Sequence, residues 1–253
     1  MIGVIDSGLG GLSVLRELVR VFPGEKMTYV GDSAHCPYGT KSPEEIQERC
    51  FLLCDYLIAQ GADLIVIACN SATIAAVGLL RAEFPIPIVG MEPAIKPAAK
   101  LSKTGVIGVF ATEASLRGEK FHRLVSRHAT GLRVIKTPCP EFVRLVEQGQ
   151  LTGPEVDTAF RLYADPMLEK GADVLILGCT HYPFLYPRMR ELLPPEVHLL
   201  ETGRAVAKRA FDLRENSQPG SLSFLTSGDP AKIRGLLPKL IPGLTVDIER
   251  FTG

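Results

Sequence analysis

The sequence predicts an α/β protein made of two pseudo-symmetric lobes, each a mostly parallel sheet flanked by helices. Two observations support this prediction. Short runs rich in Val, Ile and Leu alternate with helix-length periodic segments along the chain of 253 residues. Segments of the first half also recur in the second half at a nearly constant offset, which indicates a duplicated unit. Because ligands bind at the carboxyl ends of parallel strands, we expect the active site in the crevice between the lobes.

The elements of the first half each have a sequence signal. Residues 2–6 predict a strand, and a glycine-rich turn then leads into a helix that reaches about Val21. Residues 27–30 and the continuously apolar run at 63–68 predict two more strands, the latter covered by helices on both faces. Ser42-Pro43-Glu44-Glu45 has the spacing of a capping box with proline at the first helical position, so a helix is expected to begin there. The apolar face of that helix carries Ile46, Cys50, Leu53, Cys54 and Leu57.

The internal repeat is clearest around two cysteines. Residues 61–69 (GADLIVIAC) align with residues 171–179 (GADVLILGC), with four of nine positions identical and an offset of 179 − 69 = 110. Residues 2–5 match residues 107–110, which lie 105 positions later, and residues 27–30 match 132–135 more weakly. In the second half, Thr152-Gly153-Pro154-Glu155 predicts another capping box. Three matches in the same order predict two lobes with one strand order.

Composition and charge exclude several classes of protein. Lys plus Arg and Asp plus Glu balance at 28 each, without the basic excess of a nucleic-acid binder. No apolar run is long enough to span a bilayer, and the N-terminus lacks the pattern of a signal peptide. The six cysteines are therefore expected to be reduced thiols of a cytoplasmic protein. They form no Cys-x-x-Cys motif and no zinc-like spacing with histidine, so we expect no structural metal.

Cys69 and Cys179 are the candidate catalytic residues. Each ends a predicted strand and precedes a polar turn, Asn70-Ser71-Ala72-Thr73 in one case and Thr180-His181-Tyr182-Pro183 in the other. At such a helix start, unpaired N–H groups and the helix dipole are expected to favour the thiolate. If the lobes face each other, the two sulfurs approach one ligand from opposite sides. This is the arrangement of a two-base racemase, in which one thiolate removes an α-proton and the opposite thiol supplies another.

The other cysteines have simpler interpretations. A lone cysteine at a strand end is usually a small core residue, and only the duplication at matching positions favours catalysis. Cys50 and Cys54 are expected to be core residues because they lie on the apolar face of a helix. Cys36 and Cys139 lie in proline-bearing turns and have no predicted role.

Further polar residues are candidates for supporting the two thiols. A carbanion-like transition state needs donors near the α-carboxylate, and Asn70, Ser71 and Thr180 are placed to supply them. Asp6 ends the first strand and His181 follows Cys179, so each is a candidate for tuning a thiol. A helix-capping aspartate and a backbone-bonded histidine remain the alternatives.

At these residues the sequence resembles the glutamate racemases of the aspartate/glutamate racemase superfamily. The resemblance covers residues 1 to about 205 and depends mainly on the two cysteine motifs in this order and spacing. Further matches are Asp6-Ser7-Gly8-Leu9-Gly10-Gly11-Leu12, Gly31-Asp32, Cys36-Pro37-Tyr38-Gly39 and Cys139-Pro140-Glu141-Phe142-Val143 through Glu147. The resemblance implies an enzyme that interconverts L- and D-glutamate without pyridoxal phosphate, another cofactor or a metal, and that supplies D-glutamate for peptidoglycan synthesis.

The resemblance also implies roles for individual residues. Cys69 would abstract the proton from D-glutamate and Cys179 from L-glutamate, assisted by Asp6 and His181 on their respective sides. Glu147 would support His181, with a solvated helix glutamate as an equal alternative. The residues expected to hold the substrate are Ser7, Pro37, Tyr38, Gly39, Asn70, Ser71, Thr73 and Thr180.

The division of the chain is likewise implied by the resemblance. We expect residues 1–92 to form the first lobe, with a helix at 203–216 packing back on it. Residues 93–202 are expected to form the second lobe, completed by residues 217–253. The expected assembly is a homodimer with a small-molecule substrate and no membrane or nucleic-acid partner.

Three other functions stay open. A racemase of the same superfamily that acts on aspartate would use the same two thiols. A dinucleotide-binding protein would explain the strand before Gly8-x-Gly10 and the acidic Asp32, but Ser13 occupies the third glycine position and the paired cysteines have no purpose there. A catalytically idle relative that binds another protein, such as DNA gyrase, is opposed by the intact cysteine motifs.

Overall fold

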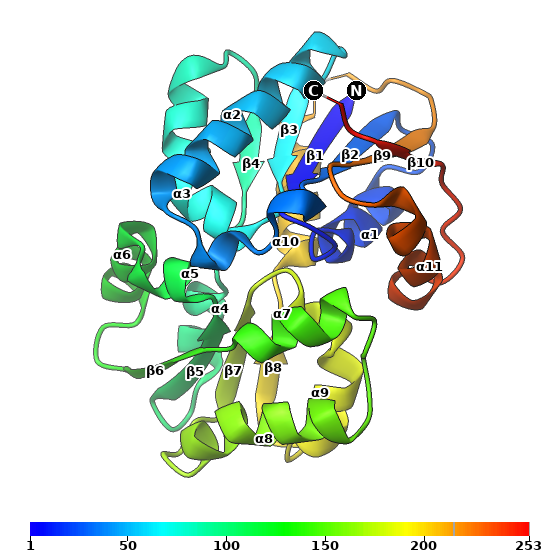
Figure 1. The fold of residues 1–253 in the computed structure, drawn as a ribbon. Coiled ribbons are helices and arrows are strands. Elements are labelled where there is room, and N and C mark those ends of the chain that lie inside the picture. The colour runs from blue at the N-terminus through cyan, green and yellow to red at the C-terminus, as the bar shows by residue number, and fades with distance from the viewer. Residues whose placement is uncertain (215, 253) are drawn as a thin grey trace.

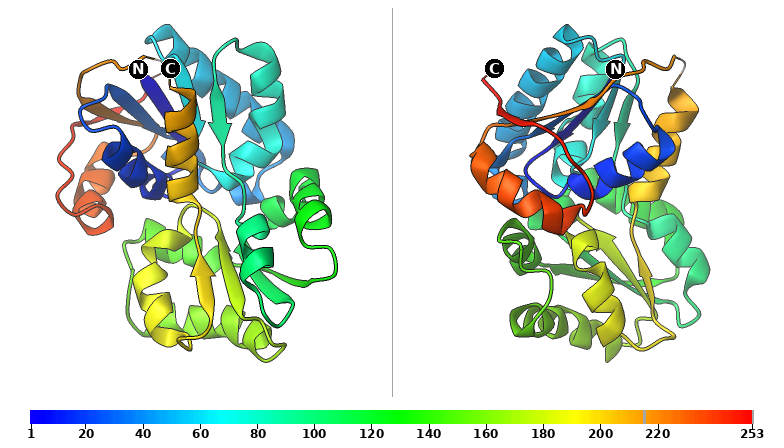
Figure 2. Two further views of the ribbon diagram at one scale, coloured as in Figure 1. Left: turned by 180° about the vertical axis from the view of Figure 1, so that it is seen from behind. Right: turned by 90° about the vertical axis from the view of Figure 1, so that its right-hand side faces the viewer.

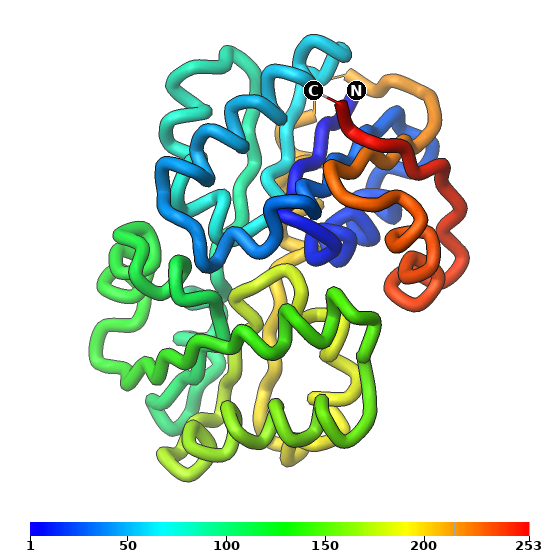
Figure 3. The backbone as a smooth tube through the Cα atoms, viewed as in Figure 1, coloured from blue at the N-terminus to red at the C-terminus, as the bar shows by residue number. Residues whose placement is uncertain are grey.

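The computed structural model describes residues 1–214 and 216–252. The chain forms two lobes, one above the other in Figure 1, each built on a parallel sheet with helices on both faces. It leaves the first lobe after β4 (Ile88–Gly90) and returns after β8 (His198–Leu200), so it passes twice between the lobes (Figure 3). The predicted α/β class with two lobes is confirmed. Within the described ranges, no helix combines the length and apolar character needed to cross a membrane.

The first lobe has a six-stranded sheet in the order β10-β9-β2-β1-β3-β4. β1 (Ile2–Asp6) lies between β2 (Met27–Gly31) and β3 (Leu64–Ile67). The strand pairs of this sheet are parallel. β1 and β3 are buried along their whole length, which explains why their sequences are almost continuously apolar.

The second lobe has a four-stranded parallel sheet in the order β6-β5-β7-β8. Besides β8, its members are β5 (Val106–Ala111), β6 (Arg133–Pro138) and β7 (Val174–Gly178). This order reproduces the order β2-β1-β3-β4 of the first lobe. The common strand order predicted from the internal repeat is therefore confirmed.

The strand register also agrees with the clearest sequence matches. Ile2 pairs with Leu64 of β3, and Ile107 pairs with Val174 of β7. These four residues occupy equivalent positions in the predicted alignment of the two halves. The two lobes thus repeat the hydrogen-bonding register of these strands as well as their order.

The weakest of the three matches needs a correction. Ile2 pairs with Met27 of β2, whereas Ile107 pairs with Val134 of β6. The counterpart of Met27 is therefore Val134, and the predicted match with Leu132 is two residues out of register. A shift of two keeps each side chain on the same face of the sheet, so the apolar pattern does not reveal the error.

Helices cover both faces of the first sheet. α1 (Leu12–Val21) and α10 (Gly203–Leu213) pack together on one face, and α2 (Pro43–Ala59) and α3 (Asn70–Glu83) on the other (Figure 2). α10 lies within the range of the helix expected at 203–216. The five residues predicted for the apolar face of α2, including Cys50 and Cys54, are all buried.

One of the two predicted capping boxes is present. At the start of α2, the Glu45 amide donates to the Ser42 hydroxyl, and the Ser42 amide donates to the Glu45 carboxylate. The second prediction is wrong, because α8 (Pro154–Leu168) begins one residue later than expected. Its N-cap is Gly153, whose φ of 104° favours glycine, and no side chain caps the first turn there.

The second sheet is covered in the same manner. α4 (Ile95–Leu101) and α6 (Glu119–His128) pack on one face, with α5 (Glu113–Arg117) leading into α6. α7 (Pro140–Glu147), α8 and α9 (Tyr186–Leu192) pack on the other face. On that face, the Phe110 ring of β5 lies 5.9 Å from Phe142 of α7 and 6.2 Å from Phe160 of α8, measured between centroids. This packing fixes α7 beside the carboxyl ends of the strands.

The C-terminal segment belongs to the first lobe, so the prediction that residues 217–253 complete the second lobe is wrong. β9 (Leu222–Thr226) pairs with β2, β10 (Ile248–Arg250) pairs with β9, and α11 (Pro230–Leu240) packs against β10. Without β9, β2 would be an unpaired edge strand, and the added pairing satisfies its backbone groups. Glu215 and Gly253, which fall in the predicted terminal segments, lie outside the described residues.

The return of the chain is anchored by one buried arginine. Arg214 forms ion pairs with Glu25 at 2.6 Å and with Asp63. The side chains of Arg214 and Glu25 are only 6% and 3% exposed. This anchor holds the segment that follows α10 against the first lobe, next to the open edge of β2.

The loops after the carboxyl ends of the strands lie between the lobes (Figure 1). Short 3₁₀ helices occur there: η1 (Ser33–His35) and η2 (Tyr38–Thr40) after β2, and η3 (Tyr182–Phe184) after β7. The predicted crevice is therefore built from loops of both lobes.

Candidate active site

The two cysteines predicted to be catalytic lie at the junction of the lobes. Cys69 follows β3 of the first lobe, and Cys179 follows β7 of the second. Both side chains are buried, with exposures of 5% and 6%. Residues next to the two cysteines are in contact across the junction. The hydroxyl of Thr180, which follows Cys179, donates to the Asp6 carboxylate of the first lobe at 3.4 Å. The fold thus brings one thiol from each lobe to a single crevice.

Cys69 caps the N-terminus of α3. Its sulfur accepts from the Ala72 amide at 3.5 Å and lies 3.8 Å from the Ser7 hydroxyl. Burial raises the pKa of Cys69 to about 12, and the charges of Asp6 and Cys179 act in the same direction. The helix amide lowers the pKa but does not outweigh burial. The helix start therefore favours the thiolate as expected, but burial has the larger effect on the pKa of Cys69.

Asp6 lies on the Cys69 side of the crevice, at the end of β1. Its carboxylate accepts from the Gly8 amide at 2.9 Å, and its side chain is buried. Burial raises the pKa of Asp6, while the charge of His181 and the amides of Gly11 and Gly8 oppose the rise. A carboxyl group with a raised pKa next to a thiol is suited to exchanging a proton with it.

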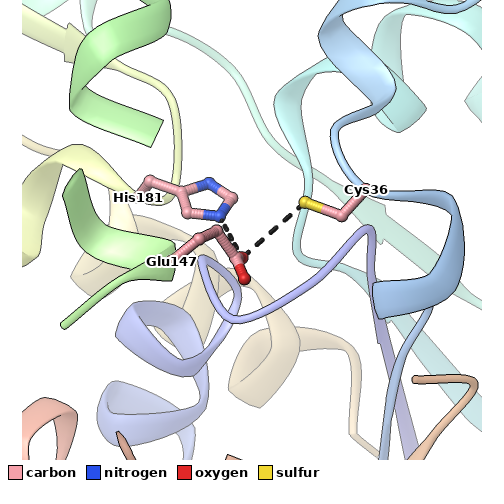
Figure 4. A group of neighbouring side chains, drawn as sticks. All are labelled: Cys36, Glu147 and His181. Carbon is pink, nitrogen blue, oxygen red and sulfur yellow. Dashed lines mark hydrogen bonds and ion pairs between the residues drawn. The ribbon is translucent and has the colours of Figure 1, made fainter. Parts of the chain in front are cut away.

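Cys179 has a different neighbour. The residues that follow it form the 3₁₀ helix η3 rather than an α-helix, and its sulfur lies 3.7 Å from His181 Nδ1. The other ring nitrogen, Nε2, lies 2.8 Å from Glu147 Oε1 (Figure 4). Burial acts to lower the pKa of His181, but its hydrogen bonds with Cys179, Cys36 and Glu147 raise the pKa well above the usual value. This side of the crevice therefore favours a protonated imidazole.

Glu147 is held in place at the end of α7. The Leu9 amide of the first lobe donates to its Oε1 at 3.0 Å, and the side chain is 19% exposed. Burial acts to raise the pKa of Glu147, but the hydrogen bond and charge of His181 hold the pKa below its usual value. The carboxylate therefore lies against His181, which excludes the alternative of a solvated helix glutamate.

The glycine-rich turn after β1 lets the second lobe approach closely. A Cβ atom at Gly10 would lie 2.4 Å from His181 Nδ1, and one at Gly8 would lie 2.6 Å from Glu147 Oε1. Such contacts are too short for packed atoms, so either side chain would have to move. The turn, a weak motif in the sequence, is the surface on which the His181–Glu147 pair lies.

Asn70 is the most unusual polar residue of the crevice. Its side chain is 3% exposed, yet neither its oxygen nor its nitrogen bonds to any part of the chain that the structure describes. A buried amide without partners costs about 1–3 kcal/mol. The free donor and acceptor of Asn70, next to Cys69, make it a candidate contact for a polar ligand.

Hydroxyl groups supply further hydrogen-bonding capacity between the lobes. The Ser71 hydroxyl lies 2.9 Å from the Thr112 hydroxyl across the junction. Ser7 lies beside Cys69, and Thr180 beside Asp6. The predicted substrate residues Ser7, Ser71 and Thr180 are thus gathered around the two cysteines.

A cavity of about 640 Å³ opens at the junction of the lobes. Its walls include Cys36, Pro37, Gly39, Thr112 and Glu147. Its size is within the range of small-molecule sites. The predicted residues Pro37 and Gly39 therefore line this cavity.

Two of the predicted substrate residues have their hydroxyl groups engaged elsewhere. The Tyr38 hydroxyl donates to Asp32 at 2.6 Å, so only the ring and backbone of Tyr38 remain for a ligand. The Thr73 hydroxyl donates to the Ile67 carbonyl and accepts from the Met91 amide. Thr73 therefore joins β3 to the segment after β4, and the expectation that it contacts substrate is not supported by its geometry.

Asp32 is not available to a dinucleotide. Its carboxylate is fully buried and accepts from Arg49 at 2.9 and 3.0 Å and from Tyr38. Burial acts to raise the pKa of Asp32, but Arg49 and Tyr38 hold the pKa below its usual value. Because the carboxylate oxygens of Asp32 already accept these hydrogen bonds, they are not available to accept one from a ribose hydroxyl.

Two residues near the cysteines were missed by the sequence interpretation. Cys36 has no predicted role, yet its sulfur lies 3.7 Å from Glu147 Oε1, and its only sequence signal is the adjoining Pro37-Tyr38-Gly39 motif. Thr112, which bonds to Ser71, follows β5 as Ser7 follows β1. The repeat offset of 105 gives 7 + 105 = 112, so the repeat itself contained the signal for Thr112.

Comparison with known proteins places the chain among racemases. The family model described as Asp/Glu/Hydantoin racemase matches residues 2–210. A glutamate racemase of Pseudomonas putida is 48% identical over 246 residues, which are 94% of this chain and 93% of that protein.

Solved structures show the same fold. Escherichia coli glutamate racemase, in complex with L-glutamate and the activator UDP-MurNAc-Ala, has a TM-score of 0.89 at 30% identity. The match covers 99% of this chain and 97% of that chain. Francisella tularensis glutamate racemase, in complex with D-glutamate, has a TM-score of 0.85 at 28% identity, with the same coverage of 99% and 97%.

Proposed function

The chain belongs to the Asp/Glu/hydantoin racemase family, and we propose that it interconverts L- and D-glutamate by a two-cysteine proton transfer that needs no cofactor. It is an amino-acid racemase, and therefore an isomerase. One observation carries the proposed mechanism. Cys69 and Cys179 come from equivalent strands of the two lobes, lie in one crevice, and each has its own ionisable neighbour.

From L-glutamate, we assign proton removal to Cys179 and proton delivery to Cys69. His181, held by Glu147, lies 3.7 Å from Cys179 and accepts its proton, while Cys69 stays a thiol because burial raises its pKa to about 12. Cys179 takes the α-proton, and the electron pair left at the α-carbon takes the proton of Cys69 on the opposite face. His181 thus assists the base on one face of the substrate, and the Cys69 thiol is the acid on the other.

From D-glutamate, the two thiols exchange roles. Cys69 must then lose its proton to Asp6, whose pKa burial raises, and take the α-proton. His181 returns its proton to Cys179, and the Cys179 thiol delivers a proton to the electron pair at the α-carbon from the opposite face. The carbanion-like transition state needs donors around the α-carboxylate. Asn70, Ser71 and Thr180 fill this role, with the free N–H groups at the start of α3.

Glutamate is preferred to aspartate on the evidence of relatives. The Pseudomonas putida protein, 48% identical over nearly the whole chain, is a glutamate racemase. The Escherichia coli and Francisella tularensis structures hold L-glutamate and D-glutamate respectively. Both enantiomers thus occur in relatives that share this fold.

The test is isotope exchange in D₂O without added cofactor. The purified enzyme is incubated with L-glutamate and, separately, with D-glutamate. Circular dichroism follows racemisation, and NMR follows deuterium at the α-carbon. We expect both enantiomers to racemise with deuterium incorporation, and Cys69→Ala or Cys179→Ala to abolish net racemisation. Cys54→Ala, which removes another buried thiol from the core face of α2, is the matched control.

The outcomes separate the rival functions. Activity on aspartate but not on glutamate would keep the mechanism and change the substrate. Full racemisation by either single catalytic-cysteine variant would contradict the two-base mechanism. Absence of exchange with both amino acids would leave a binding role for the crevice.

The biological setting is also part of the proposal. D-glutamate formed by this enzyme would serve peptidoglycan synthesis in the cytoplasm, as expected for a reduced-thiol racemase. We propose a homodimer, for which the partly exposed Val21 and Phe211 on the packed helices α1 and α10 offer an apolar surface. Light scattering of the wild type and of Phe211→Ser tests this assembly, and an unchanged mass in the variant would exclude that surface.

A further inference from the structure

A group of three side chains beside the catalytic cysteines has the chemistry of a metal site. The sulfur of Cys36, a carboxylate oxygen of Glu147 and a ring nitrogen of His181 all lie within 4.8 Å of one another (Figure 4). We propose that this cluster binds Zn²⁺ and that the ion inhibits the enzyme. The inhibition rests on the proposed role of His181, whereas the binding does not.

The donor set suits zinc better than other common divalent ions. A thiolate, an imidazole and a carboxylate are the three ligand types that Zn²⁺ takes in proteins, usually with tetrahedral geometry. Magnesium and calcium prefer oxygen ligands, so a site with sulfur and nitrogen disfavours them. Three protein ligands leave the fourth position to water, as in an open zinc site.

One distance between the donor atoms fits a tetrahedral ion, and a second is shorter than such an ion needs. Ordinary zinc bond lengths predict about 3.6 Å between sulfur and oxygen and about 3.4 Å between nitrogen and oxygen. The Cys36 sulfur lies 3.7 Å from Glu147 Oε1, close to that value. Glu147 Oε1 and His181 Nε2 are 2.8 Å apart, because a shared proton now joins them. Replacing this proton by the ion requires the pair to separate by about 0.6 Å.

The cluster is both accessible and supported. Cys36 and Glu147 line the cavity of about 640 Å³, which gives an ion a route to the site. On the opposite side, a Cβ at Gly8 would lie 2.6 Å from Glu147 Oε1 and 2.9 Å from Cys36 Sγ, so the turn is a wall of the site. The Leu9 amide also holds the Glu147 carboxylate. Outer hydrogen bonds of this kind orient metal ligands.

Zinc at this site would prevent one half of the proton transfer. An ion on His181 Nε2 replaces the 2.8 Å contact between this nitrogen and Glu147, so the ring is no longer held where its Nδ1 lies 3.7 Å from Cys179. It also takes the carboxylate of Glu147 as a ligand. Binding releases the thiol proton of Cys36 and the proton on His181 Nε2, while the catalytic sulfurs of Cys69 and Cys179 remain unbound.

The binding test uses Co²⁺ as a coloured substitute for Zn²⁺ with the full-length, reduced enzyme under anaerobic conditions. One Co²⁺ per chain is expected to give a thiolate-to-cobalt charge-transfer band and the intense visible bands of tetrahedral cobalt. Competition with a coloured chelator then measures the affinity for Zn²⁺. Removing one ligand in Cys36→Ala should weaken binding by at least about 100-fold, since loss of an outer-shell partner alone costs ~10–100-fold.

Two further variants identify the thiol that binds. Cys69→Ala should keep the cobalt bands, because its sulfur lies outside the cluster, and Cys54→Ala is the matched control for loss of a buried thiol. Glu147→Gln should weaken binding as well, which protects the test if Cys36→Ala does not fold. Bands that persist in Cys36→Ala, or that vanish in Cys69→Ala, would overturn the site.

Inhibition is measured separately by racemisation at increasing Zn²⁺, relative to the uninhibited rate of each variant. The concentration for half-inhibition should rise in Cys36→Ala by the same factor as the dissociation constant. An unchanged half-inhibition concentration would overturn the inhibitory role even if zinc binds. An enzyme without racemase activity would still answer the binding question through the cobalt spectrum.

Discussion

Replacing Gly10 by alanine tests the role of the turn that supports His181. The new Cβ would lie 2.4 Å from His181 Nδ1 and 2.7 Å from the Thr180 hydroxyl. An ordinary contact of about 3.5 Å requires the ring to move by roughly 1 Å. The ring is held by Glu147 at 2.8 Å and lies 3.7 Å from Cys179 Sγ, so the displacement disturbs this arrangement. A misplacement of ~1 Å at a catalytic group costs on the order of 10²-fold in rate.

The assay is the initial rate of racemisation of each enantiomer, followed by circular dichroism. Because L- and D-glutamate have equal free energy, kcat/KM must fall by the same factor in both directions. Overpacking should also lower the free energy of unfolding by about 1–3 kcal/mol. Gly78→Ala is the matched control, since a Cβ there meets nothing within 4 Å in the middle of α3. It should leave the rate unchanged and stabilise the helix by about 1 kcal/mol.

The result that refutes this reasoning is a folded Gly10→Ala enzyme with a rate within about threefold of the wild type, against the ~10²-fold loss expected. Such an enzyme would show that His181 need not occupy the position seen here. A similar loss in Gly78→Ala would show that the rate responds to any added methyl group rather than to the turn.

Three further predictions concern buried polar groups. Arg214→Ala leaves the buried Glu25 without its cation and should lower the free energy of unfolding, measured in urea, by about 3 kcal/mol. Burial acts to raise the pKa of Glu25, but hydrogen bonds that include Arg214 hold it below the usual 4.5. The stabilisation by Glu25 is therefore complete above pH 4.5 and is lost as pH falls through the folded-state pKa. Glu147→Gln removes the counter-charge of His181, which lowers the histidine pKa, so the alkaline limb of kcat/KM should move to lower pH with a loss of about tenfold or more. Asn70→Ala should reduce kcat/KM by about 10²-fold without lowering the melting temperature, because it removes a buried amide that has no partner in the described residues.

The first two of these predictions each have a matched control. Arg204→Ala on α10 removes an 81% exposed arginine and should cost less than about 1 kcal/mol. Glu141→Gln on α7 removes a 46% exposed carboxylate and should leave the pH profile unchanged. Equal destabilisation by the two arginine variants, an unshifted alkaline limb in Glu147→Gln, or a lower melting temperature in Asn70→Ala would contradict the corresponding argument.

Much of the fold could be predicted because its signals are local or periodic. The apolar runs at residues 2–6 and 63–68 identify buried parallel strands, and the Ser42–Glu45 spacing identifies the start of α2. The recurrence of residues 61–69 at 171–179 predicts a common strand order and places Cys69 and Cys179 at equivalent strand ends. These features depend on backbone geometry and on the pattern of side-chain burial, which each segment carries in its own sequence.

The neighbours of the catalytic thiols followed only partly from sequence. Asp6 and His181 adjoin the motifs that predicted them, but Cys36 and Glu147 lie 111 residues apart and meet only when α7 packs against the turn after β1. No spacing rule connects residues on separate loops of two lobes. Their contact is set by the way the lobes close on each other.

The protonation of Cys69 and the course of the C-terminal segment were decided by tertiary structure alone. A helix start favours a thiolate locally, but burial beside Asp6 raises the pKa of Cys69 to about 12, and burial is a property of the whole fold. The segment after α10 joins the first lobe for two reasons. β9 pairs with the edge of β2 that would otherwise be unpaired, and Arg214 forms an ion pair with the buried Glu25 of the first lobe. The sequence by itself determined the elements, their repeat and the two cysteines. Packing determined the environment of those cysteines, because desolvation and contacts between distant segments exist only once the lobes are assembled.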